Sequence, residues 1–164
     1  MKNMDTDFNT LNTKDAFEIT QEGLDTLKVE LAKLRDAKRP TVVERLANAR
    51  MQGDLAENSD YHNAKDELEF LDGRISELED VIKNAKVVVT SGNGSVALGT
   101  SVKVKSNGST HVFHIVGEWE ADPAEKRISH TSPLGQALVG KKVGDRVDVE
   151  APAGKIVYEI LSIE

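Results

Sequence analysis

The chain has 164 residues, a formal net charge of −7, 30% charged residues, only 4% aromatic residues and no cysteine. Without cysteine it has no disulfide, no catalytic thiolate and no cysteine-ligated zinc site. The acidic balance argues against a free-standing nucleic-acid-binding protein, because such proteins gain most of their affinity by neutralising phosphates. The N-terminus lacks the apolar core of a signal peptide, and no apolar run could span a membrane. We therefore expect a cytoplasmic protein that makes no membrane contact.

Residues 1–18 are polar and have no apolar periodicity, which predicts a flexible tail. A helical region is expected after this tail, over residues 19–89. Its first half has leucines three and four residues apart, the spacing of a coiled-coil seam: Leu24, Leu27, Leu31 and Leu34. The pattern slips near Pro40 and resumes at Val42 or Val43. Because proline kinks a helix, we expect one long helix that bends there.

The second half of the helical region has an unbroken seam, formed by Tyr61, Ala64, Leu68, Leu71, Ile75, Leu78, Ile82 and Ala85. Only a few residues separate the two runs, so the helices must fold back on one another as an antiparallel coiled-coil hairpin. At 1.5 Å per residue, each helix of roughly 30 residues would be about 45 Å long. The region is thus predicted to form a finger with residues 51–58 at its tip, and we expect a monomer.

The composition changes after the finger, where residues 90–99 are small and turn-forming and predict a linker. Beyond the linker we expect four strands and one short helix: strands at 100–105, at 110–117 after an Asn-Gly turn, and two within 145–163, with the helix at 132–140. Residues 100–164 are therefore predicted to form a small, mostly antiparallel sheet with one helix packed on it. The fold class of the whole chain is α+β.

Asp54 and Glu57 lie three residues apart at the predicted tip. This spacing is typical of a capping box, which is the commoner reason for such a pair. Capping alone does not require two acids at the far end of a solvated finger, flanked by Arg50 and Lys65. The two roles are compatible, because a cap would also hold both carboxylates in fixed positions.

No other residue cluster predicts an independent active site. His111 and His114 are three residues apart in a predicted strand, so they face opposite sides and cannot bind one metal ion together. His62 is expected to be solvated or packed against a helix. The sequence has no Walker motif, no G-x-S-x-G motif and no dinucleotide-binding motif.

The tip segment resembles a known family. Residues 49–88, "ARMQGDLAENSDYHNAKDELEFLDGRISELEDVIKNAKVV", are similar to the coiled coil of the bacterial Gre transcript-cleavage factors, the GreA type in particular. The preceding "RPTVVERLANAR" matches the segment that leads into that tip, and "SPLGQALVGKKVGDRVDVEAPAGKIVYEILSIE" is similar to the C-terminal domain of the family. The resemblance covers roughly residues 20–164, with its separate stretches in the family's order.

This resemblance implies a transcription elongation factor. Its finger would enter the secondary channel of RNA polymerase, and an FKBP-like C-terminal domain would dock on the rim of the channel. The factor would not be an enzyme, but would stimulate the polymerase's own cleavage of backtracked nascent RNA and so rescue arrested complexes. The acidic net charge fits GreA better than the more basic GreB.

The resemblance also implies roles for four tip residues. Asp54 and Glu57 would complete a Mg²⁺ site shared with the polymerase, while Arg50 and Lys65 would steer the phosphates of the backtracked RNA. The protein would have no cofactor of its own. Mg²⁺ binds proteins through one or two carboxylates and keeps most of its waters, so two acids cannot hold it unaided.

Several alternatives remain open at this point. The nearest is a Gre-like regulator that binds in the channel and inhibits polymerase without stimulating cleavage, although such a protein would be expected to have an altered tip. DksA-type factors carry a cysteine zinc site, which this chain lacks. An FKBP-like prolyl isomerase with a coiled-coil handle needs an aromatic-lined pocket, for which the C-terminal half offers only Phe113, Trp119 and Tyr158. A purely structural coiled coil would not explain the tip.

Overall fold

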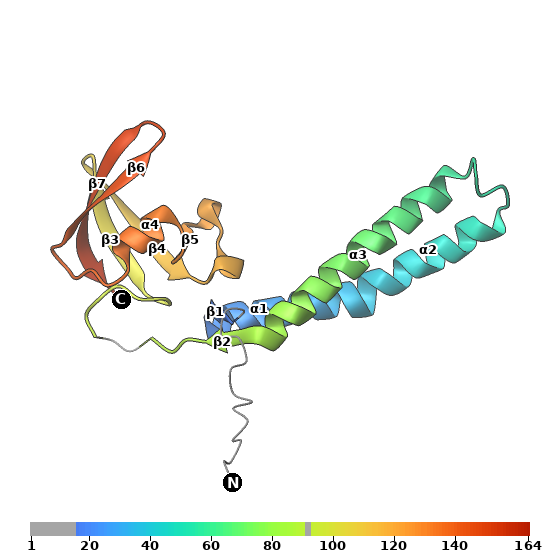
Figure 1. The fold of residues 1–164 in the computed structure, drawn as a ribbon, viewed down its shortest axis with the longest axis horizontal. Helices are drawn as coiled ribbons and strands as arrows, with labels where there is room; N and C mark the ends of the chain where they lie inside the picture. Colours follow the sequence, from blue (N-terminus) through green and yellow to red (C-terminus); the bar gives the residue numbers. More distant parts are fainter. Residues whose placement is uncertain (1–15, 91–92) are drawn as a thin grey trace, which may run out of the picture.

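The fold consists of a long helical hairpin and a small sheet domain that lies at the base of the hairpin (Figure 1). It is taken from a computed structural model, which describes residues 16–90 and 93–164. Residues 1–15, most of the expected tail, lie outside the described residues. Residues 17 and 18, which were also expected in the tail, instead belong to a strand, β1 (Phe17–Ile19). A strand of three residues is too short to show periodicity in the sequence.

The helical hairpin connects two parallel strands at its base. The elements after β1 are α1 (Gln21–Ala32), the π-helical turn η2 (Lys33–Lys38), α2 (Arg39–Met51), α3 (Ser59–Asn84) and β2 (Ala85–Val87). Strand β2 pairs in parallel with β1. Parallel neighbours need a crossover connection of a dozen or more residues, and the whole hairpin serves as that connection. The expected antiparallel pairing of the two helical arms is confirmed by contacts of α3 with both α1 and α2.

The π-helical turn η2 explains why the leucine pattern slips near Pro40. Pro40 lies at the start of α2, and the helical arm continues through it. Directly before it, the Arg39 N–H donates to the Leu34 carbonyl, five residues back instead of four. Such a turn holds one extra residue, which makes the step from Leu34 to the next seam residue eight instead of seven. Val42 is accordingly buried while Val43 is 39% exposed, which resolves the alternative left open by the sequence.

The buried side chains of α3 follow the predicted seam except near the base of the hairpin. Ala64, Leu71, Ile75 and Leu78 are buried as expected. At the next step Val81 is buried, and the predicted Ile82 is only half-buried. The reason is a change of partner, because Val81 packs in a cluster with Ile19, Leu27 and Leu78, to which β1 contributes. The buried residues of α3 therefore depart from the heptad spacing near β1, at the base of the hairpin.

Ion pairs across the hairpin align α1 and α2 with α3. Arg39 Nε lies 2.6 Å from Asp72 Oδ1, and the hydrogen bond from Arg39 lowers the pKa of Asp72. Nearer the base, Arg74 Nη2 lies 3.0 Å from Glu30 Oε1. These groups are partly exposed, and such pairs add little to stability. Their main effect is on register, because a shift of one helix along the other would separate the opposite charges.

The sheet domain has the strand order β5-β4-β3-β7-β6. Its elements are β3 (Ser101–Ser106), β4 (Ser109–Val116), β5 (Arg127–Ser129), α4 (Pro133–Leu138), β6 (Arg146–Ala151) and β7 (Gly154–Ile163), with 3-10 turns η3 (Glu118–Glu120) and η4 (Pro123–Glu125) before β5. The four predicted strands and the helix are all present. The predicted turn has positive φ at both Asn107 and Gly108, which a type I′ hairpin turn requires. Strand β5, which was not predicted from the sequence, pairs in parallel with β4.

The second half of the predicted linker belongs to the sheet domain. Val96 and Leu98 are both buried, and Val96 packs in the core of the domain with residues of β3, β4, α4 and β7. The Val96 N–H donates to the Lys141 carbonyl at 2.8 Å. The glycine and serine content of residues 90–99 concealed these two apolar side chains. In the described ranges, no helix is long and apolar enough to cross a membrane.

The seam predicts that alanine substitutions at two neighbouring residues of α3 will have very different effects on the free energy of unfolding. Leu71 is 2% exposed, so Leu71→Ala should lower the free energy of unfolding by about 2–5 kcal/mol. Phe70, the adjacent residue, is 75% exposed, and Phe70→Ala should change that free energy by less than about 0.5 kcal/mol. Urea denaturation followed by circular dichroism measures both variants. Equal losses would mean that Leu71 does not face the partner helix.

Candidate functional site at the tip of the hairpin

A short loop, residues 52–58, connects α2 to α3 at the end of the hairpin farthest from the sheet domain (Figure 1). The Gln52 N–H donates to the Ala49 carbonyl at 3.2 Å and continues the last turn of α2. Gly53 then has φ +81°, the left-handed conformation that ends many helices. Asp54 follows with φ +26°, a positive value that aspartate tolerates better than most residues. The chain thus leaves α2 sharply before it reaches the two acids.

Asn58 caps α3. Its side-chain oxygen accepts a hydrogen bond from the Tyr61 N–H at 3.0 Å, and its side-chain Nδ2 donates to the Ala49 carbonyl at 2.7 Å. One side chain therefore satisfies the start of α3 and ties it to the end of α2. Asp54 and Glu57 therefore do not form the capping box that their spacing suggested as one interpretation, because the helix begins at Ser59 and Asn58 is its N-cap. Asparagine ranks with aspartate as an N-cap, so residue type alone could not choose between the candidates.

Both acids are exposed and available for contact. Within the part of the chain that the structure describes, neither the Asp54 nor the Glu57 carboxylate takes part in a side-chain hydrogen bond or ion pair. Asp60, in the first turn of α3, is different, because its Oδ1 accepts a hydrogen bond from Arg45 Nε at 3.0 Å. That hydrogen bond and its charge raise the pKa of Arg45. The carboxylate of Asp60 is thus engaged within the hairpin, and the two loop carboxylates face solvent.

The two basic residues named from the sequence, Arg50 and Lys65, lie on the helices at either side of the loop. The Arg50 guanidinium, in the last turn of α2, lies over the Tyr61 ring with 5.9 Å between its carbon and the ring centroid. This is the distance range of a cation–π contact, which holds the charge beside the loop. Lys65 is exposed on α3 and stands about 9 Å along the helix from Ser59, at 1.5 Å per residue. Both helices therefore present positive charge behind an acidic tip.

The described residues do not contain a complete metal site at the tip or elsewhere. In residues 16–90 and 93–164, no group of three or more histidine, cysteine, aspartate or glutamate side chains is placed to hold a metal ion. His111 stacks on Phe113, with 6.0 Å between ring centroids, whereas His114 Nδ1 lies 2.8 Å from Ser101 Oγ. Asp54 and Glu57 supply the kind of oxygen ligand that Mg²⁺ prefers, but too few ligands to bind it tightly.

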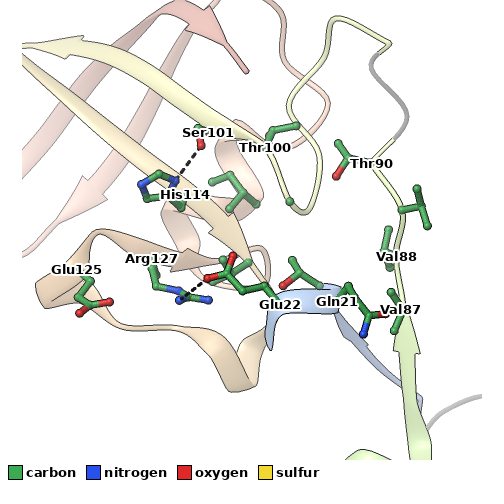
Figure 2. A pocket seen from close by; sticks show the side chains of 15 residues that line it. Gln21, Glu22, Val87, Val88, Thr90, Thr100, Ser101, His114, Glu125 and Arg127 are labelled. Atoms are coloured by element: carbon green, nitrogen blue, oxygen red, sulfur yellow. Dashed lines mark hydrogen bonds and ion pairs between the residues drawn. The ribbon is translucent and has the colours of Figure 1, made fainter. Parts of the chain in front are cut away.

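A hollow in the surface lies at the end of the hairpin opposite to the tip. A cleft of about 710 Å³ separates the start of α1 and the segment after β2 from the sheet domain. Figure 2 shows Glu22 and Arg127 facing one another in this cleft, with Ser101 and His114 on the sheet. The cleft contains none of the four predicted site residues. It belongs to the junction between the two parts of the molecule.

Comparison with known proteins gives the same assignment for both parts of the chain. The family models described as "Transcription elongation factor, N-terminal" and "Transcription elongation factor, GreA/GreB, C-term" match residues 17–87 and 91–164. Transcription elongation factor GreA of Bacillus anthracis (strain CDC 684 / NRRL 3495) is 44% identical over 156 residues, which cover 93% of this chain and 99% of that protein. Its counterpart from Lactococcus lactis subsp. lactis (strain IL1403) is 45% identical over 152 residues, covering 90% and 97%.

A solved structure is similar over the same length. The crystal structure of GreA factor homolog 1 (Gfh1) of Thermus thermophilus has 27% sequence identity to this chain and a TM-score of 0.43. The match covers 91% of this chain and 99% of that one.

The loop geometry predicts that Asn58, and neither acid, stabilises α3. Asn58→Ala should lower the free energy of unfolding by about 0.5–2 kcal/mol, the usual cost of a lost N-cap. Asn58→Asp keeps the acceptor for the Tyr61 N–H and should recover most of this loss. Asp54→Asn and Glu57→Gln should leave the urea midpoint unchanged. A loss in either acid variant as large as that of Asn58→Ala would restore the capping interpretation.

Proposed function

Since the chain belongs to the GreA/GreB family of transcription elongation factors, we propose that it stimulates the cleavage of backtracked nascent RNA by RNA polymerase. The helical hairpin would enter the secondary channel of the polymerase and the sheet domain would dock on its rim. One observation carries this proposal: Asp54 and Glu57 are exposed at the end of the hairpin and are not used to cap its helix. Two uncommitted carboxylates at that point are available to an active site provided by a partner.

The dimensions of the hairpin suit a probe that reaches into a channel. Helix α3 has 26 residues, so the tip stands about 39 Å from the base at 1.5 Å per residue. The hairpin is only two helices thick, and its sides carry exposed, mostly charged residues over much of this length. The sheet domain lies at the base, where it would remain outside a narrow channel (Figure 1).

The two acids fit a share of a Mg²⁺ site and not a whole one. Their carboxylate oxygens are of the type that Mg²⁺ prefers, and the remaining ligands would come from the polymerase, the RNA and water. When bound, Mg²⁺ supplies Lewis-acid stabilisation of the charge that develops during phosphodiester hydrolysis. The contribution of this chain is to bring Asp54 and Glu57 to that point on a loop whose ends are tied together by Asn58.

Arg50 and Lys65 would act on the RNA. Both are positively charged side chains beside the tip, where the chain is otherwise acidic. Attraction to phosphates would draw the extruded 3′ end toward the loop. Because such attraction is screened by salt, the contribution of these two residues should be largest at low ionic strength.

The decisive test removes the charge of each acid and preserves its size. Asp54→Asn and Glu57→Gln should each reduce cleavage stimulation by about 10²-fold or more, the scale of losing one preorganised electrostatic group at a reaction centre. Neutral amides are poor substitutes for carboxylates as Mg²⁺ ligands. The measurement is the rate of RNA shortening in stalled elongation complexes, together with competition against the unmodified protein for binding to polymerase. Binding should be unchanged in both variants.

Two controls accompany this experiment, and two outcomes would contradict the proposal. Asp66→Asn removes one exposed acid from the side of α3 and should leave cleavage unchanged, which separates tip chemistry from net charge. The purified protein without polymerase should hydrolyse no RNA, because it has only part of a metal site. A protein that binds polymerase and slows it without stimulating cleavage would instead be the inhibitory regulator. Full activity in both amide variants would remove the acids from the mechanism.

A further inference from the structure

Glu120 is a buried carboxylate at the junction between the hairpin and the sheet domain. It lies in η3 of the sheet domain, and its side chain is only 2% exposed. A carboxylate that is removed from water must be compensated by hydrogen-bond donors, and Glu120 has four. On its own domain it accepts from the Gly117 N–H at 3.0 Å and from Arg127 Nη2 at 3.3 Å. The other two donors belong to the hairpin.

Those two donors are both on Thr20, the residue that begins α1. The Thr20 N–H donates to Glu120 Oε2 at 2.9 Å, and the Thr20 hydroxyl donates to Oε1. The same hydroxyl oxygen accepts from the Gly23 N–H at 3.0 Å, which is the N-cap of α1. One hydroxyl therefore connects the cap of the first helix to a buried acid of the other domain, one hundred residues along the chain.

The close approach of the two parts depends on glycine at two positions. A methyl group on Gly23, in the first turn of α1, would overlap the Glu120 carboxylate. A methyl group on Gly117 would overlap the Glu18 carbonyl in β1. Neither glycine has a positive φ, so space and not backbone conformation explains them. Gly73, on the exposed side of α3, is the contrasting case, because a methyl group there would touch nothing.

Within the described parts of the chain, few other side-chain contacts hold the hairpin against the sheet domain. The Phe17 and Trp119 rings meet edge to face with 5.9 Å between centroids, and the His130 Nε2 lies 3.4 Å from Glu18 Oε2. On the other side of Thr20 the cleft of about 710 Å³ opens (Figure 2). Among the described residues, its two sides are joined by the Glu22–Arg127 ion pair at 3.9 Å and by a hydrogen bond from the Thr90 hydroxyl to the Leu98 carbonyl at 3.2 Å. The contact of Glu120 with Thr20 is therefore the centre of a small junction.

We propose that Glu120 is a positioning residue: by holding Thr20 it fixes the direction in which the hairpin leaves the sheet domain. The tip lies at the end of a long lever, so small changes at the junction have large effects. With a length of about 39 Å, from 1.5 Å per residue, a tilt of about 10° moves the tip by about 7 Å. Misplacing a reacting group by about 1 Å can cost 10²-fold in rate. The effect on cleavage rests on the proposed function, whereas the effect on direction does not.

The first measurement needs neither polymerase nor RNA. Since the chain has no cysteine, spin labels can be attached to Asn63→Cys near the tip and Ser109→Cys on the sheet, both exposed positions. Double electron–electron resonance should give one narrow distance distribution for the otherwise unmodified protein. Glu120→Gln should shift or broaden it, because the amide NH2 group must face either the Thr20 and Gly117 N–H donors or the Arg127 guanidinium donor, and it cannot accept a hydrogen bond from either. Thr20→Val should do the same, and Thr20→Ser, which keeps the hydroxyl, should restore the narrow distribution.

A pair of glycine variants separates an effect on the direction of the hairpin from an effect on helix stability. Gly23→Ala and Gly73→Ala each replace glycine by a better helix former, so each should favour its own helix. Only Gly23→Ala forces the Glu120 carboxylate out of its site. The distance distribution should therefore broaden in Gly23→Ala and stay narrow in Gly73→Ala. In Glu120→Ala, where the space is free, adding Gly23→Ala should cause no further broadening.

The cleavage assay then tests the consequence for activity. Glu120→Gln and Gly23→Ala should reduce cleavage stimulation by about tenfold or more, and Gly73→Ala should leave it unchanged. Unchanged distance distributions in Glu120→Gln and Gly23→Ala would overturn the proposal, as would a distribution in the parent protein as broad as in the variants. Altered distances with unaltered cleavage would overturn the link between direction and activity. If the parent protein stimulates no cleavage, the proposed function fails, and the distances still decide the role of Glu120.

Discussion

The reach of this molecule depends on a single apolar seam between two helices. A compact domain buries each core residue among neighbours from several elements, whereas the two arms of the hairpin, α3 on one side and α1, η2 and α2 on the other, bury side chains mainly against one another. Ala64 and Leu71 are buried in this way far from any third layer. Because no third layer could cover a misplaced apolar side chain, the apolar side chains must face the partner helix along the whole hairpin. The π-helical turn maintains this alignment, since it absorbs the one residue by which the first arm is out of step at Pro40.

The tip shows how structure and chemistry are divided among neighbouring residues. Asn58 takes both structural duties, capping α3 and bonding to the end of α2. Asp54 and Glu57, on the same loop, are thereby left without a structural partner. This division allows the acids to be exchanged with little effect on folding, and it allows the loop to present them at a defined place. At the base of the hairpin the opposite holds, because the carboxylate of Glu120 is buried and makes its hydrogen bonds to groups within the protein.

The sequence predicted an element well where its formation depends only on residues close by in the chain. The heptad of α3, the Asn-Gly turn at residues 107–108 and the Ser-Pro start of α4 each depend on neighbours in the sequence. Features that depend on distant residues were missed. Strands β1 and β5 are three residues long and exist because a remote strand offers a parallel edge. The acid Glu120 looked like an ordinary surface residue, and only the fold brings Thr20 to it.

The sequence predicted where along the hairpin the candidate site residues lie, but not the geometry of the loop that carries the two acids. The positions of Asp54, Glu57, Arg50 and Lys65 at or beside the tip follow from counting helical residues on each side of Gly53. The capping of α3 did not follow, because Asp54 and Asn58 are both good N-caps and the choice depends on where the loop allows the helix to begin. The bond from Asn58 to Ala49 favours the later start. That bond joins two helices, so no rule for a single helix could include it.

The parallel pairing of β1 with β2 would allow the finger to be replaced by one of a different length. The chain enters and leaves the hairpin through two strands in register, Phe17 opposite Ala85 and Ile19 opposite Val87. Neighbouring strands are about 4.8 Å apart, so both attachment points of the finger occupy nearly the same place. The finger is thus a self-contained cassette, which could be lengthened, shortened or transplanted by whole helical turns without moving its anchor. Lengthening or shortening both helices by part of a turn would rotate the tip about the axis of the finger. Fingers of different length would therefore point the same loop in different directions.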